Sequence, residues 1–213
     1  MTAHRSALRR VAAAAATVTA AVVLAACGND ASTASHSGHG ESSPGVSAPA
    51  SAGEHNAADV SFAQGMIPHH RQAVEMADLA ADRAASQEVK ELAAEIKKAQ
   101  QPEIDTLTGW LESWGEDVPA EGSTDHSAHS GHGSHGMAGM MSPEQMEELE
   151  KSSGTAFDTA FLTLMIEHHK GAVAMAEAEK RNGSHGPAKS LADDVIATQN
   201  AEIDTMNRLL GKE

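Results

Sequence analysis

The sequence is poor in cysteine, in aromatic residues and in positive charge, and each shortage excludes a class of protein. One cysteine in 213 residues cannot form a disulfide framework or a multi-cysteine zinc or iron–sulfur site. Three Phe, two Trp and no Tyr are too few for a base-stacking surface and disfavour a β-sandwich. Lys and Arg number 15 against 30 Asp and Glu, so nucleic-acid binding is not expected, because a phosphate backbone requires a basic face. The abundant residue types with useful chemistry are His, with 13 copies, and Met, with 10.

The first 27 residues have the pattern of a bacterial export signal. Three arginines precede an apolar run, residues 11–26, which is short for a membrane span and typical of a signal peptide. Small residues stand directly before Cys27, as in a lipobox, although an ordinary signal peptide with an incidental cysteine is the alternative. We expect removal of residues 1–26 and lipidation of Cys27. The mature protein would then be extracytoplasmic, anchored to the outer face of the bacterial cell membrane.

Two segments have the composition of tethers. Residues 27–58 contain mainly Ser, Gly, Ala and Pro, with almost no large apolar side chain, so they cannot bury a core. Residues 115–142 are similar but collect imidazoles and thioethers, which a plain linker does not need. Tracts rich in His are typical of metal binding, and thioethers favour soft ions. The candidate ligands in this linker are His126, His129, His132, His135, Met137, Met140 and Met141.

The sequence repeats itself after 99 residues. Residues 59–108 align with 158–207 without a gap, and 18 of the 50 positions are identical. Apolar residues recur at spacings of three and four within each copy, which predicts a helical hairpin. We therefore expect an all-α four-helix bundle from two hairpins, 59–114 and 143–211, because neither hairpin can bury its apolar face alone. A capping box at the start of the second range predicts an additional short helix there.

Each copy places two adjacent histidines and two methionines on one helix face. With about 100° of turn per residue, the four side chains lie within roughly 120° of one another, beside a small alanine. Buried Met and His are often only core residues, but the same set occurs in both copies. We predict a metal centre where the two faces meet. Its expected ligands are Met66, His69, His70, Met76, Met165, His168, His169 and Met175.

The ligand types favour copper, mainly as Cu(I), and silver as a similarly soft ion. Di-iron bundles use Glu-x-x-His motifs, and the chain contains none, because Met66 and Met165 stand where the carboxylates would be. Thioether and imidazole donors without thiolate suit copper. The second helix of each hairpin is expected to orient the imidazoles through hydrogen bonds. The residues predicted for this role are Gln100, Glu103, Gln199 and Glu202.

The doubled pattern F-x3-M-I-x-H-H-x2-A-V-x-M-A resembles the family known as domain of unknown function 305, over about residues 59–210. The resemblance implies a ferritin-like bundle, found in exported bacterial proteins. Some relatives are associated with copper binding and copper tolerance, which implies the same for this chain and the same eight His and Met ligands. The missing carboxylates distinguish the chain from ferritins, so the fold does not imply ferroxidase activity.

These observations predict an extracytoplasmic lipoprotein that scavenges, stores or delivers Cu(I) or Ag(I), with a copper-trafficking protein as a partner. The alternative is a metal-dependent oxidoreductase in the same bundle, which would need an open coordination position. Haem binding through His and Met is disfavoured by the absence of Cys-x-x-Cys-His and by the few aromatics. A purely structural bundle is also open at this stage.

Overall fold

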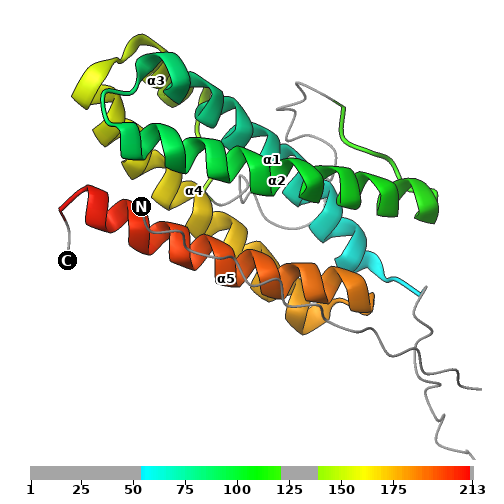
Figure 1. Ribbon diagram of the computed structural model, residues 1–213. Helices are drawn as coiled ribbons and strands as arrows, with labels where there is room; N and C mark the ends of the chain where they lie inside the picture. Colours follow the sequence, from blue (N-terminus) through cyan, green and yellow to red (C-terminus); the bar gives the residue numbers. More distant parts are fainter. Residues whose placement is uncertain (1–53, 121–138, 212–213) are drawn as a thin grey trace, which may run out of the picture. The chain divides into compact units, whose positions relative to one another are not determined.

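Two helical hairpins and one short helix form the part of the chain that the structure, a computed structural model, describes: residues 54–120 and 139–211 (Figure 1). Those two ranges contain no strand. The expected all-α, ferritin-like bundle of two repeated hairpins is therefore confirmed. The predicted signal peptide, Cys27 and the centre of the His/Met linker lie outside the described residues. The helices are α1 (Ala57–Arg83), α2 (Gln87–Trp114), α3 (Pro143–Lys151), α4 (Gly154–Asn182) and α5 (Gly186–Leu209).

Capping residues explain where two of the helices begin. Asn56 caps α1 by accepting the backbone N–H groups of Ala58 and Asp59, and the Asp59 carboxylate accepts the Asn56 N–H in return. Ser142 and Gln145 form the same reciprocal box at α3. Such boxes satisfy backbone donors that the first helical turn leaves without partners.

The helices α1 and α4 form the central pair, with α2 packed on α1 and α5 packed on α4. Buried apolar side chains of these helices gather in two clusters. None of the helices in the described residues is both long and apolar enough to cross a membrane.

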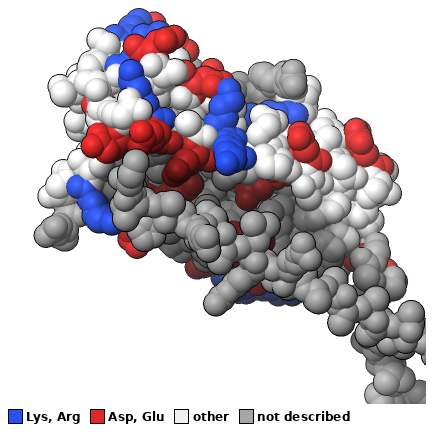
Figure 2. All heavy atoms as spheres, in the orientation of Figure 1, with Lys and Arg blue, Asp and Glu red and all other residues white. Residues whose placement is uncertain are grey.

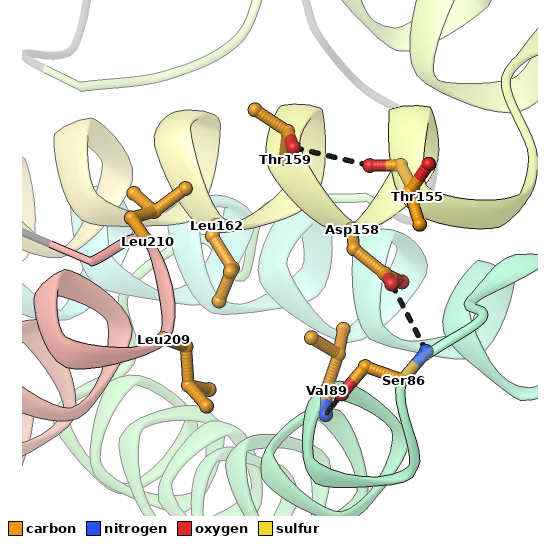
Figure 3. Close-up of a pocket in the computed structure, with 8 residues that line it drawn as sticks. All are labelled: Ser86, Val89, Thr155, Asp158, Thr159, Leu162, Leu209 and Leu210. Atoms are coloured by element: carbon orange, nitrogen blue, oxygen red, sulfur yellow. Dashed lines mark hydrogen bonds between the residues drawn. The ribbon is translucent and has the colours of Figure 1, made fainter.

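Each repeat uses a buried aspartate to hold the turn of the other repeat. Asp158, near the start of α4, accepts the backbone N–H groups of Ala85 at 3.0 Å and Ser86 at 2.9 Å, in the turn between α1 and α2 (Figure 3). Asp59, near the start of α1, accepts those of Ser184 at 3.1 Å and His185 at 2.9 Å, in the turn between α4 and α5. These bonds join the start of α1 to the end of α4 and the start of α4 to the end of α1. They fix α1 and α4 as an antiparallel pair.

The Asp59 carboxylate also has a buried acidic neighbour, Glu179. A Cβ at Gly183 would lie 2.1 Å from Glu179 Oε1 and 2.8 Å from Asp59 Oδ1, so the glycine leaves room for the two carboxyls. Burial first, and then the hydrogen bond and charge of Asp59, raise the pKa of Glu179 to about 8. Burial would also raise the pKa of Asp59, but the hydrogen bonds from Glu179 and from the backbone outweigh it and lower that pKa to about 2. At neutral pH Glu179 therefore keeps its proton while Asp59 is ionised.

Both ends of the segment expected as a linker are packed on α1. Gln64 Nε2 donates to the carbonyl of Asp117 at 2.9 Å, and Arg71 donates to that of Pro119 at 2.7 Å. At the other end, Gln72 bonds the backbone of Met141. Residues at both described ends of the predicted linker 115–142 are therefore hydrogen-bonded to α1.

We predict that Glu179→Gln changes how stability depends on pH. In the unfolded chain Glu179 loses its proton near pH 4.5, whereas the folded protein keeps it to about pH 8. The folded state thus binds more protons across this window, and the free energy of unfolding falls as pH rises through it. Gln cannot ionise, so the variant lacks this loss of stability. Between pH 5 and pH 8 its free energy of unfolding should rise by on the order of 3 kcal/mol relative to that of the wild type.

Urea unfolding followed by circular dichroism at both pH values measures this difference. The control is Glu177→Gln on the exposed side of α4, which should follow the wild-type curve. Parallel curves for wild type and Glu179→Gln would show that Glu179 is ionised in the folded protein.

Candidate metal centre

The antiparallel α1–α4 pair brings one histidine of each repeat into contact. The rings of His69 and His168 have centroids 3.8 Å apart and planes inclined by 43°. These two histidines and their neighbours, His70 and His169, all have no exposed surface. The expected meeting of the two His/Met faces is therefore found in the bundle interior.

The methionines flank the histidine pair on both sides. Met76 of α1 and Met165 of α4 belong to one apolar cluster. Met66 of α1 and Met175 of α4 belong to the other, and Met175 is the one member of the four that is only partly buried. Each side of the histidine pair thus has one thioether from each repeat, as antiparallel packing of duplicated helices requires.

Carboxylates on the second helices hold the outer histidines. Glu103 Oε2 of α2 lies 2.7 Å from His70 Nε2, and Glu202 Oε2 of α5 lies 2.6 Å from His169 Nε2. A carboxylate only accepts, so Nε2 carries a proton in both imidazoles, and the neutral form of each ring has its lone pair on Nδ1. This is the arrangement by which proteins orient an imidazole toward a metal ion.

Buried polar atoms without protein partners gather around these histidines. They include Nδ1 of His70 and of His169 and both ring nitrogens of His168. Gln100 and Gln199, one turn before the two glutamates, are 2% and 3% exposed, and neither amide oxygen has a hydrogen-bond partner among the described residues. An unsatisfied buried polar group costs about 1–3 kcal/mol, so these atoms would be stabilised by a ligand that bonds to them.

Burial keeps the central imidazole neutral. Removal from water lowers the pKa of His168 well below its usual range, and the nearby His69, His169 and His70 lower it further. A neutral imidazole offers the lone pair that a metal ion needs. The donor set therefore fits a metal ion at physiological pH.

The geometry also restricts which ion fits. Within residues 54–120 and 139–211, no three His, Cys, Asp or Glu side chains stand together in an arrangement that could hold a metal ion. Hard ions such as Mg²⁺ need several oxygen ligands. The thioether sulfurs beside the histidines are soft donors, and such donors favour a soft ion such as Cu(I) or Ag(I).

Some predicted site residues lie elsewhere or are not described. The linker residues His126, His129, His132, His135 and Met137 lie outside the described part of the chain. Met140 is partly buried and Met141 is buried. Sequence reasoning missed the role of Gln72, for which one signal existed: the second repeat has Gly171 at the equivalent position.

A cavity at one end of the bundle is separate from this centre. A cavity of about 290 Å³ lies between the start of α2, the start of α4 and the end of α5, and no predicted ligand lines it. Figure 3 shows Leu162, Leu209 and Leu210 beside the Asp158–Ser86 hydrogen bond. The remaining lining residues are Val89, Thr155 and Thr159.

The opposite end of the bundle is filled instead. Trp110, the repeat equivalent of Leu209, and Trp114 both meet the edge of the His185 ring, with centroids 5.3 and 5.1 Å from it. His55 stacks on Trp114 at 4.4 Å. On the face shown in Figure 2, Lys and Arg side chains are scattered among Asp and Glu and form no single basic patch.

Comparisons with known proteins agree with this architecture. The chain resembles a DUF305 protein from Streptomyces coelicolor, described as secreted, with 33% identity over 73% of this chain and 91% of that one, and a TM-score of 0.63. A DUF305 fragment from Deinococcus radiodurans is 30% identical over 74% of this chain and 98% of that one, with a TM-score of 0.63.

A third similar structure is CopM in its Cu(II)-bound form. It is 36% identical over 71% of this chain and 94% of that one, with a TM-score of 0.59. CopM structures with Cu(I) and with silver bound are also similar to this chain. No match was found among curated proteins. The family model for the domain of unknown function DUF305 matches residues 59–210, which is most of the chain. The chain belongs to the DUF305 family.

Proposed function

We propose that this protein binds copper, as Cu(I), inside the helical bundle, and that Ag(I) can replace it. The observation that carries the proposal is the buried His69–His168 pair between two methionine pairs. Around it, Nδ1 of His70, Nδ1 of His169 and both ring nitrogens of His168 have no hydrogen-bond partner among the described residues. The ligands are the four histidines of the two repeats with Met66, Met76, Met165 and Met175.

The comparisons support the choice of metal. CopM, which is similar in structure and above 30% identical, is known in Cu(I)-bound, Cu(II)-bound and silver-bound forms. Softness of the donor set supports Cu(I) over Cu(II), because thioethers bind the reduced ion better. Complete burial of the four histidines favours holding an ion over turning over a substrate, so binding is proposed in preference to catalysis.

The location proposed for this binding is outside the cytoplasmic membrane. The export signal and Cys27 support a lipid anchor, and a similar DUF305 protein is described as secreted. In this position the protein would intercept copper and pass it to a trafficking partner, which supports copper tolerance. The four histidines of the central linker would collect additional ions.

Replacing both central histidines should abolish tight binding. Without His69 and His168, the ion loses the nitrogen donors between the methionine pairs, so Cu(I) affinity of His69→Ala/His168→Ala should fall by at least about 100-fold. Competition with a chromophoric Cu(I) chelator under anaerobic conditions measures the affinity and the number of ions bound.

The matched control is His55→Ala/His185→Ala, which removes two histidines from the tryptophan cluster at the bundle end. It should bind as the wild type does. Circular dichroism checks that each variant is helical, and His69→Gln/His168→Gln replaces the alanine pair if that pair does not fold. Unchanged affinity and stoichiometry in a folded variant would exclude the proposed centre.

The carboxylates behind the outer histidines should strengthen binding. Glu202→Gln keeps the side-chain shape but removes the carboxylate that orients His169, so Cu(I) affinity should fall about tenfold. The same chelator competition applies. Glu167→Gln, which alters an exposed ion pair with Lys170 on α4, is the control and should leave affinity unchanged. Equal affinities in all three proteins would mean that Glu202 does not act on the metal.

The linker histidines should add capacity and leave the tightest site intact. Replacing His126, His129, His132 and His135 together by Ser removes imidazoles outside the bundle. The number of weakly bound Cu(I) ions should fall while the highest affinity stays unchanged. Equilibrium dialysis followed by metal analysis measures the capacity. An undiminished ion count would show that the linker does not collect copper.

A further inference from the structure

The residues Gly139–Ser142 cross the central helix pair beside the histidines. The Gln72 side chain on α1 donates from Nε2 to the Met141 carbonyl at 3.0 Å and accepts the Met141 N–H on Oε1 at 2.8 Å. Both bonds are buried. A two-way amide contact fixes the position and the direction of the Met141 backbone, because neither group can turn without losing both bonds.

The same segment lies directly on the backbone of α4. Gly139 has a φ of 85°, and a Cβ there would stand 2.5 Å from the Glu167 carbonyl oxygen and 3.0 Å from that of His168. It would also stand 3.0 Å from the Cα of Gly171. Only glycine permits this approach, so the chain meets α4 at the turn that carries His168.

The side chain of Met141 enters the interior on one side of the histidine pair. It is 8% exposed and lies in the apolar cluster that contains Met76 and Met165. Gln72, which holds it, is three residues after His69 and one helical turn before Met76. That cluster also contains Met146 of α3 and Met206 of α5, but of these three additional methionines only Met141 has its backbone fixed by a side chain of α1. The cluster around Met66 and Met175 contains no third methionine among the described residues.

The repeat itself explains why only one side has this addition. Gln72 and Gly171 occupy equivalent positions 99 residues apart, and each serves the same short segment. The glutamine binds its backbone, and the glycine leaves space for it against α4. The two duplicated positions have therefore diverged in a way that serves one shared contact with this segment.

We propose that Met141 is a further thioether ligand of the soft-metal centre, on the Met76/Met165 side, and that Gln72 is the residue that positions it. This inference rests on the proposed copper function. It makes the two sides of the histidine pair unequal. The side of Met76 and Met165 has three proposed sulfur ligands, and the side of Met66 and Met175 has two. The side with three binds Cu(I) or Ag(I) more tightly.

Met141→Leu tests the ligand directly, because leucine preserves the buried volume while removing the sulfur. Cu(I) affinity at the tightest site should fall about tenfold, and X-ray absorption should show fewer sulfur ligands per copper. Met146→Leu is the matched control: Met146 of α3 is buried in the same cluster. It should change neither measurement.

Gln72→Ala tests the positioning role. This variant retains the Met141 sulfur but removes both bonds that hold the Met141 backbone, so the number of sulfur ligands per copper should fall, as in Met141→Leu. Gln72→Glu keeps the acceptor for the Met141 N–H and should lose fewer sulfur ligands.

The outcomes separate this inference from the function on which it rests. If Met141→Leu matches wild type while His69→Ala/His168→Ala loses copper, the centre stands and Met141 is only core packing. If the histidine variant also binds normally, the copper function itself fails. A loss of equal size in Met146→Leu would assign the effect to packing and overturn the proposal.

Discussion

The antiparallel register of α1 and α4 is the constraint on which the site depends, and two buried aspartates set it. Asp59 and Asp158 each accept backbone N–H groups from the turn of the opposite repeat. Charge-assisted bonds of this kind contribute about 1.5–3 kcal/mol each. Because they tie both ends of the helix pair, a slip along the helices would break them together. The contact between His69 and His168 follows from this register.

Duplication explains both the similarity and the differences between the two halves. Positions that serve the interior are the same in both copies, including the histidine pairs and the glutamates that orient them. Positions that differ have acquired local tasks. Glu179 keeps its proton beside Asp59 where the first repeat has Ala80, and Trp110 fills a bundle end where Leu209 leaves a cavity. The two copies thus share the histidines and their glutamates, and they differ at the bundle ends and at the pair Gln72 and Gly171.

Much of the fold could be predicted from the sequence because its signals are local or periodic. Helical spacing, capping residues and the 99-residue repeat predicted the hairpins, and the helix faces grouped the histidines with the methionines. The contacts of Gln72 and Gly139 could not be predicted, since they join segments 69 residues apart or depend on close backbone approach. The same holds for Glu179, whose environment is formed by a turn and a helix start that are distant in sequence.

The attachments on α1 also have an evolutionary consequence. Arg71 bonds the backbone at Pro119 and Gln72 bonds it at Met141, so the described residues on either side of 121–138 are attached to adjacent residues of one helix. Insertions or deletions between these two anchors need not move any helix, because both anchors stay bonded. A lineage could therefore lengthen or shorten this stretch, and change its number of histidines, while the bundle stays the same.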